Sequence, residues 1–107
     1  LAGGLAAHGA KLVSGGEFIL RHLRFRKRIR GAALVLTGEG RFDATSLHGK
    51  IVGEVLRACG RIPCVVLCGS AGIAGRTIEL AALAGSVESA MRDPSRWLAE
   101  AAAQACR

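Results

Sequence analysis

A glycine-rich segment near the middle of the chain, residues 37–50, carries the side chains best suited to chemistry. Glu39 and Asp43 supply carboxylates that can ligate Mg²⁺ or accept the proton of a hydroxyl group. Gly38 and Gly40 can bring backbone N–H groups close to a phosphate or carboxylate, because glycine tolerates positive φ. We therefore expect this segment to contact an anionic ligand.

The spacing of this segment does not match two common nucleotide-binding motifs. A Walker A loop would need Gly in place of Ala44 and Ser or Thr in place of Ile51. The Gly-x-Gly-x-x-Gly fingerprint of dinucleotide-binding proteins fails as well, because Asp43 stands where its third glycine belongs. Spacing alone is therefore not diagnostic of nucleotide binding.

Two interpretations of the cations in this segment remain open. Thr45 or Ser46 could cap the following helix. His48 and Lys50 would then lie near its first turn, where positive charge opposes the helix dipole by about 0.3 to 1 kcal/mol and a bound anion would offset the cost. Alternatively, Asp43 is an ordinary cap or turn residue and Lys50 is a solvated side chain.

A second glycine-rich segment, residues 69–72, contains Ser70. We do not expect Ser70 to be an activated nucleophile, because it lacks the G-x-S-x-G elbow and none of the three histidines is ordered toward it.

The elements that must position these segments alternate between apolar runs and helical patterns. Such alternation predicts an α/β fold, a small parallel sheet with flanking helices and right-handed crossovers. In such sheets ligands bind beyond the carboxyl ends of the strands, where both glycine-rich segments fall. The predicted strands are 32–37, 64–68 and 86–91, with a loop at 38–46; the predicted helices are 3–13, 17–25, 47–59, 76–83 and 94–106.

The composition is typical of one folded domain, since half of the 107 residues are apolar and 21% are charged. Three strands make a small sheet, the chain opens with Leu1, and its only methionine is Met91. We therefore expect a piece of a longer protein, with missing strands upstream. No apolar run has the length of a membrane span and no signal peptide opens the chain, so we expect a cytoplasmic protein.

The net charge of +7 is concentrated in residues 21–30, which hold six of the fifteen Lys and Arg residues. Removing those six charges from +7 leaves +1. Such a run can contact nucleic acid, but no zinc spacing or helix-turn-helix pattern accompanies it. A solvated helix end and connector is the favoured interpretation.

Four cysteines could suggest disulfides or a metal site. Cys64 and Cys68 lie within an apolar run, where cysteine serves as a small hydrophobic residue, and there is no Cys-x-x-Cys pair. We expect reduced thiols without a metal for Cys59, Cys64, Cys68 and Cys106.

One family shares these motifs. The string ALVLTGEGRFD spans Ala33 to Asp43 and precedes Thr45–Lys50. A second apolar run then leads to Gly69 and Ser70. This pattern resembles the C-terminal part of the bacterial glycerate kinase family, in which a strand ends in Thr-Gly-Glu-Gly-Arg-x-Asp before a Thr-x-x-Gly-Lys helix start. The resemblance is strongest from Ala33 to Ser70 and thin after Gly75.

The resemblance implies a two-domain α/β enzyme of which residues 1–107 are the C-terminal segment. It implies transfer of the γ-phosphoryl group of ATP to D-glycerate, giving 2-phosphoglycerate or 3-phosphoglycerate, with Mg²⁺. Together with the demands of phosphoryl transfer, it assigns the following roles: Gly38, Gly40, Arg41, Gly69 and Ser70 contact substrate or phosphate; Asp43, Glu39 and Lys50 are catalytic; and Asp43 and Glu39 are candidate Mg²⁺ ligands.

The chain also departs from the family pattern. The N-terminal Asp-Ser-Phe-Lys stretch is absent, and the Pro that follows Ser14 in the family is replaced by glycine. We therefore expect the isolated chain to be inactive without the missing N-terminal segment. The alternatives are a basic nucleic-acid-binding module at residues 21–30 and an inactive remnant of the kinase fold.

Overall fold

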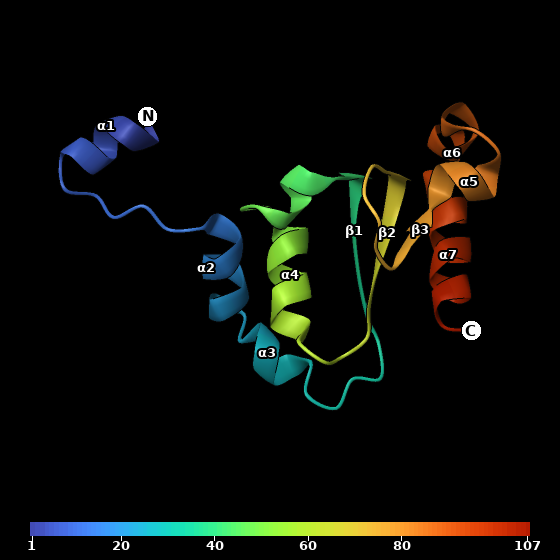
Figure 1. Ribbon diagram of the computed structural model, residues 1–107, viewed down its shortest axis with the longest axis horizontal. Helices are drawn as coiled ribbons and strands as arrows, with labels where there is room; N and C mark the ends of the chain where they lie inside the picture. Colours follow the sequence, from blue (N-terminus) through green and yellow to red (C-terminus); the bar gives the residue numbers. More distant parts are fainter.

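The computed structural model describes residues 1–107 and contains one parallel sheet of three strands in the order β1-β2-β3 (Figure 1). The strands are β1 (Val35–Phe42), β2 (Cys64–Ala71) and β3 (Thr77–Glu79). In the register of β1 and β2, Val35 lies beside Cys64 and Phe42 beside Ala71. The predicted small parallel α/β sheet with flanking helices is confirmed.

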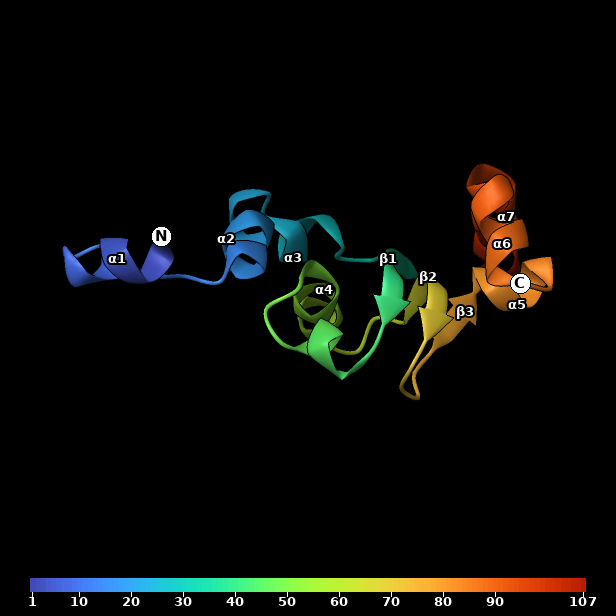
Figure 2. The ribbon, with the colours of Figure 1, turned by 90° about the horizontal axis from the view of Figure 1, so that it is seen from above.

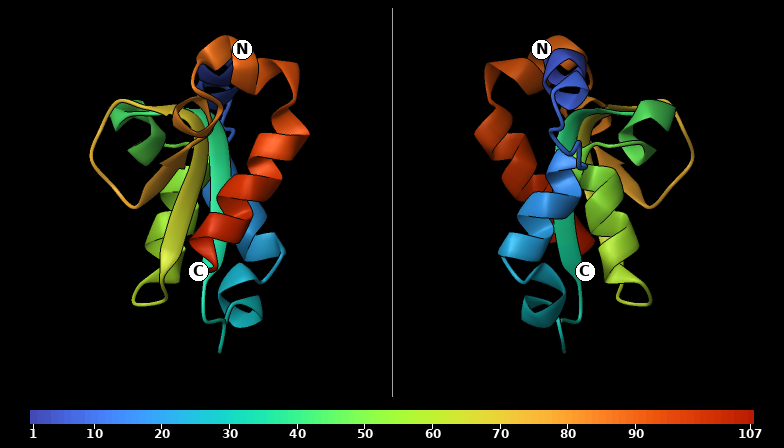
Figure 3. Two further views of the ribbon diagram at one scale, coloured as in Figure 1. Left: turned by 90° about the vertical axis from the view of Figure 1, so that its right-hand side faces the viewer. Right: turned by 90° about the vertical axis from the view of Figure 1, so that its left-hand side faces the viewer.

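The central strand β2 explains why helices must cover both sheet faces. Its four consecutive residues from Val65 to Cys68 are all buried, and neighbouring residues on a strand point to opposite faces. Val66 and Cys68 pack with Val52 of α4 (Ile51–Cys59). Val65 and Leu67 pack with Ala101 of α7 (Pro94–Ala105) on the other face. Figure 2 shows α4 and α7 on opposite sides of the sheet, and Figure 3 shows α7 lying across it.

The N-terminal third contributes three helices, α1 (Ala2–Ala7), α2 (Gly15–His22) and α3 (Phe25–Arg28). Helix α2 packs on α4 at Gly16, where an added Cβ would lie 2.9 Å from the Glu54 Cγ atom. Helix α1 stands away from the sheet at the end of an extended segment (Figure 1), and the molecule measures 50 × 34 × 23 Å.

Local signals set several helix ends. Ser14 accepts a hydrogen bond from the Glu17 backbone N–H at the start of α2. Asp93 caps α7 in the same way and Pro94 occupies the first turn, as the sequence predicts. Two short helices, α5 (Leu80–Ala84) and α6 (Val87–Arg92), precede α7. None of the helices combines the length and hydropathy needed to cross a membrane.

Several predicted boundaries are wrong. Strand β1 continues through residues 38–42, which we expected to form a loop, because extended glycines there allow β2 to approach closely. Residues 86–91 are not a strand: Ser86 caps the helix α6 by accepting from the Ser89 N–H. The third strand lies instead at the start of the expected helix 76–83. Helix α1 is shorter than the predicted 3–13, and α4 begins at Ile51 rather than Leu47.

Candidate functional site

The carboxyl ends of β1 and β2 bring most of the predicted site residues together. In the sheet register Glu39 lies beside Cys68 and Arg41 beside Ser70. The chain then leaves β1 into η1, a 3₁₀ turn at Ala44–Leu47, which leads to the start of α4. Strand ends, η1 and the α4 N-terminus therefore surround one edge of the sheet, at the top of Figure 1.

Glu39 is the most constrained acidic side chain at this edge. Its side chain is 16% exposed, and its Oε2 atom lies 3.6 Å from the Lys50 Nζ atom. Its Oε1 atom is buried and has no hydrogen-bond partner. Burying an unpaired carboxylate oxygen is unfavourable, so this oxygen is a free acceptor for a hydroxyl group or a cation.

Asp43 is held by a capping box at the start of η1. Its Oδ1 atom accepts from the Thr45 hydroxyl at 2.6 Å and from the Thr45 N–H at 3.0 Å, while the Ser46 hydroxyl accepts from the Asp43 N–H. The Arg41 Nε atom lies 3.3 Å from its Oδ2 atom. The Thr45 hydroxyl bond lowers the pKa of Asp43, and the charge of Lys50 acts in the same direction, so Asp43 is ionised at neutral pH.

These contacts decide between the two interpretations of the segment. Asp43 is a cap, and neither Thr45 nor Ser46 caps α4, whose N-cap residue is Lys50. Lys50 is not simply a solvated side chain, because it pairs with Glu39 and also influences Asp43. The lysine ammonium therefore pairs with Glu39, and its charge also favours the ionised form of Asp43.

The glycines act differently from the expectation of positive φ at Gly38 and Gly40. Neither adopts it; in this segment only Gly49 does, at φ +75°, where the chain turns into α4. A Cβ at Gly38 would lie 2.6 Å from the Leu67 carbonyl oxygen, and one at Gly69 would lie 2.6 Å from the Gly40 oxygen. Their role in the fold is therefore close approach of β1 and β2.

Sequence patterns did not point to a further acidic residue at this edge. Glu79, at the end of β3, accepts a hydrogen bond from the Ala71 N–H at 3.0 Å. Burial raises the pKa of the Cys68 thiol, and the charges of Glu79 and Glu39 raise it further. Glu79 lay within an expected helix, so only the sheet register reveals that it neighbours the site.

The residues present fit a magnesium ion that is shared with a substrate. No group of three His, Cys, Asp or Glu side chains gathers closely enough to hold a metal by itself. Mg²⁺ in phosphoryl-transfer sites commonly takes one or two carboxylates and completes its shell with phosphate oxygens and water. The unpartnered Glu39 Oε1 atom offers such a carboxylate position.

An apolar groove of about 700 Å³ adjoins the site, between the glycine segment of β1 and the helices α6 and α7. Glu39 borders it between Gly38 and Gly40, and apolar side chains such as Leu36 and Met91 line it. The groove is large enough for a small molecule, but it lies on the α7 face of the sheet. The Glu39 side chain lies on the α4 face, as does its neighbour Cys68.

Comparison with known proteins shows the family of the chain. The model of the glycerate kinase family matches residues 1–107. The chain belongs to the glycerate kinase family. An uncharacterized protein of Mycobacterium tuberculosis is 39% identical over 116 residues, which cover 97% of this chain and 30% of that protein.

Relatives with named activities match shorter stretches. A glycerate kinase of Neisseria meningitidis is 42% identical over 72 residues, covering 65% of this chain and 19% of the relative. A glycerate 2-kinase of Escherichia coli is 44% identical over 55 residues, covering 47% of this chain and 14% of the relative. No solved structure gives a significant match. The chain thus spans less than a third of the length of these relatives, and the family resemblance read from its motifs is confirmed.

Proposed function

We propose that this chain forms the C-terminal segment of an enzyme that transfers the γ-phosphoryl group of ATP to D-glycerate. The proposed product is 2-phosphoglycerate, and 3-phosphoglycerate is the alternative. Family membership supports a glycerate kinase-related function, and the relatives named glycerate kinase support the substrate. The observation that carries the proposal is the buried, unpartnered Glu39 Oε1 atom beside Lys50.

Phosphoryl transfer depends on positioning and charge neutralisation more than on covalent help from the protein. Glu39, with Asp43 as the second candidate, would hold Mg²⁺, which when bound neutralises charge on the phosphate oxygens. Asp43 is also ionised and orders the attacking hydroxyl, whose proton it accepts as the new O–P bond forms and ADP leaves. Lys50 and Arg41 stabilise the transferred phosphoryl group.

The remaining predicted residues border this centre. Gly38 and Gly40 lie on the strand that carries Glu39, and their backbone contacts the substrate. Gly69 and Ser70 approach from the neighbouring strand β2. Glu79 holds the turn after β2 through the Ala71 N–H and so positions that strand end.

We propose that the site is completed by an N-terminal segment of the same enzyme and that the isolated chain is inactive. Large apolar side chains are exposed on the helices that face away from the sheet, among them Phe18 at 62% and Ile19 at 51% on α2. Large exposed apolar side chains of this kind support a covering segment. Because the reaction consumes ATP, we place the enzyme in the cytoplasm.

The test measures D-glycerate phosphorylation by the native polypeptide that carries these residues. Glu39→Gln and Asp43→Asn should each lower kcat by about a hundredfold or more, a loss far larger than their effect on thermal unfolding. Glu39→Gln should also raise the Mg²⁺ concentration needed for half-maximal rate. Glu100→Gln, which removes an exposed pair with Arg107, is the matched control.

Two results would count against the proposal. A native polypeptide that binds ATP but never phosphorylates D-glycerate would indicate an inactive remnant of the fold. Equal losses of activity and stability in Asp43→Asn would reduce that residue to its capping role. ³¹P NMR of the product distinguishes the 2-phosphate from the 3-phosphate.

A further inference from the structure

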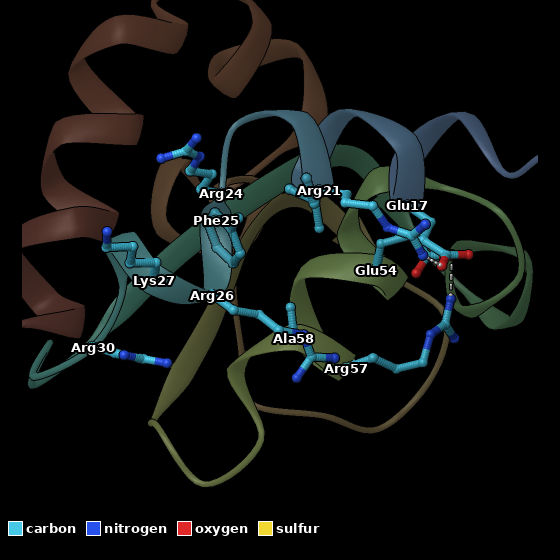
Figure 4. Close-up of a pocket in the computed structure, with 11 residues that line it drawn as sticks. Glu17, Arg21, Arg24, Phe25, Arg26, Lys27, Arg30, Glu54, Arg57 and Ala58 are labelled. Atoms are coloured by element: carbon cyan, nitrogen blue, oxygen red, sulfur yellow. Dashed lines mark hydrogen bonds and ion pairs between the residues drawn. The ribbon is translucent and has the colours of Figure 1, made fainter.

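A second groove, of about 660 Å³, lies between helices α2, α3 and α4 (Figure 4). It is near the start of β1, whereas the Glu39 site is at the end of that strand (Figure 1). Six cations line the groove, together with two carboxylates: Arg21, Arg24, Arg26, Lys27, Arg30 and Arg57, with Glu17 and Glu54.

The two carboxylates do not balance this charge. Glu17 pairs with Arg21 at 2.7 Å, and Glu54 pairs with Arg57 at 2.8 Å. The other four cations of the groove form no ion pair in the structure: Arg24, Arg26, Lys27 and Arg30. Four unpaired positive charges within seven residues repel one another, so a multivalent anion would bind with favourable charge complementarity.

An unusual turn and an apolar anchor fix the backbone that carries these cations. Arg24 has φ +52° in the left-handed region, where a residue with a Cβ is uncommon, and this turn separates α2 from α3. Phe25 then packs with the buried residues Ile29 and Val55. Figure 4 shows Arg26 extending from α3 toward Ala58 on α4, so the groove has walls from distant parts of the sequence.

We propose that this groove binds a compact anion carrying several phosphate groups, at a site separate from the Glu39 edge. Arginine guanidinium groups bind phosphate oxygens in a bidentate manner. The volume falls within the range of about 300 to 1,000 Å³ that small-molecule sites occupy. Outside residues 21–30, nine cations are offset by eight acidic residues, so the excess positive charge is concentrated at the groove, and this favours a compact ligand over nucleic acid.

The test titrates the native polypeptide with inorganic tripolyphosphate by isothermal calorimetry, without ATP or glycerate. The double variant Arg26→Gln/Arg30→Gln should weaken binding about tenfold or more. The control variant Arg76→Gln/Arg92→Gln removes two exposed arginines outside the groove and should leave the affinity unchanged. Lys50→Gln separates the groove from the proposed kinase site: it should remove only tripolyphosphate held at that site, and the binding that Arg26→Gln/Arg30→Gln weakens should remain.

Three results would overturn the proposal: no tripolyphosphate binding by the unmodified protein, equal loss in the control variant, or loss in Lys50→Gln alone. A single-stranded oligonucleotide that binds through Arg26 and Arg30 and is not displaced by tripolyphosphate would assign the groove to nucleic acid instead. Its affinity would fall with salt by the slope expected for many phosphate contacts. Because no kinase substrate is present, failure of the proposed phosphorylation leaves this result unaffected.

Discussion

The contact between α4 and η1 yields a prediction in which two physical effects have opposite signs. Gly53 is buried in the first turns of α4. On helix propensity alone, Gly53→Ala should stabilise the protein by up to about 1 kcal/mol. The structure predicts the reverse, because the added Cβ would lie 2.5 Å from the Ser46 carbonyl oxygen and 3.0 Å from two Leu47 backbone atoms.

The size of the effect follows from these contacts. Ordinary Cβ contacts begin at 3.4 Å, so the Ser46 oxygen must retreat by the difference from 2.5 Å, about 0.9 Å. All three obstructing atoms belong to the backbone, so a side-chain rotation cannot relieve the contact. Overpacking of this kind destabilises by about 1 to 3 kcal/mol. After the propensity gain is subtracted, we expect Gly53→Ala to lower the free energy of unfolding by up to about 2 kcal/mol.

The displacement should also affect catalysis, because η1 carries the Asp43 cap. A misplacement of about 1 Å in a reacting group can reduce the rate by about a hundredfold. Urea unfolding followed at 222 nm measures the stability of the native polypeptide, and a glycerate phosphorylation assay measures kcat on the same samples. Gly15→Ala is the control, since that helical glycine has nothing within 4 Å of an added Cβ.

One outcome would refute this reasoning directly. If Gly53→Ala were as stable as the unmodified protein or more stable, the close contact between α4 and η1 would be wrong, and helix propensity would dominate. If stability fell but kcat did not, η1 would have no part in positioning the reacting groups.

Two further predictions concern titrating groups. Burial, with the neighbouring Cys59 thiol, raises the pKa of Cys64 to about 12. Iodoacetamide at pH 8 should therefore alkylate the exposed Cys106 well before Cys64. Peptide mass spectrometry measures both alkylation rates, and equal rates would contradict this prediction. The lowered pKa of Asp43 means that its ionised form stabilises the fold above a pH of about 4, and that this contribution is lost as the pH falls through the folded-state pKa. Asn can keep the cap, so Asp43→Asn removes the charge alone. The Tm of Asp43→Asn should therefore be lower than that of the unmodified protein at pH 7, and the two Tm values should converge in acid. A Tm difference that stays constant with pH would show that charge is not involved.

The sequence predicts the parts of this fold that depend on local patterns. The apolar residues from Cys64 to Cys68 predict β2 because a strand buried on both faces needs a continuous apolar run. Asp93 and Pro94 predict the start of α7 because a cap and a first-turn proline act within a few residues. Residues 38–42 looked like a loop because glycine and charge are rare in strands, but their extended form depends on the approach of Leu67.

The site divides in the same way. The rule that ligands bind at strand carboxyl ends was enough to group Glu39 with Ser70, because the register follows from the parallel sheet. The unpartnered Glu39 oxygen and the proximity of Glu79 depend on packing between segments about forty residues apart in sequence. The sequence shows the charge of residues 21–30. It does not show the groove, because Arg57 and Ala58 join those residues only in the folded chain.

Helix α4 is the element that both sites share, and its packing indicates how far they influence each other. Its N-terminal end presents Lys50 to Glu39, and its last turns place Arg57 beside the basic groove. Between these ends Val52 and Val55 are buried against the sheet side of the molecule. A close-packed interior resists small displacements, and α4 contains neither a proline nor a positive-φ residue between its ends. An anion in the groove should therefore leave the geometry at Glu39 unchanged. The changes that Arg26→Gln/Arg30→Gln and Glu39→Gln make to the free energy of unfolding should be additive.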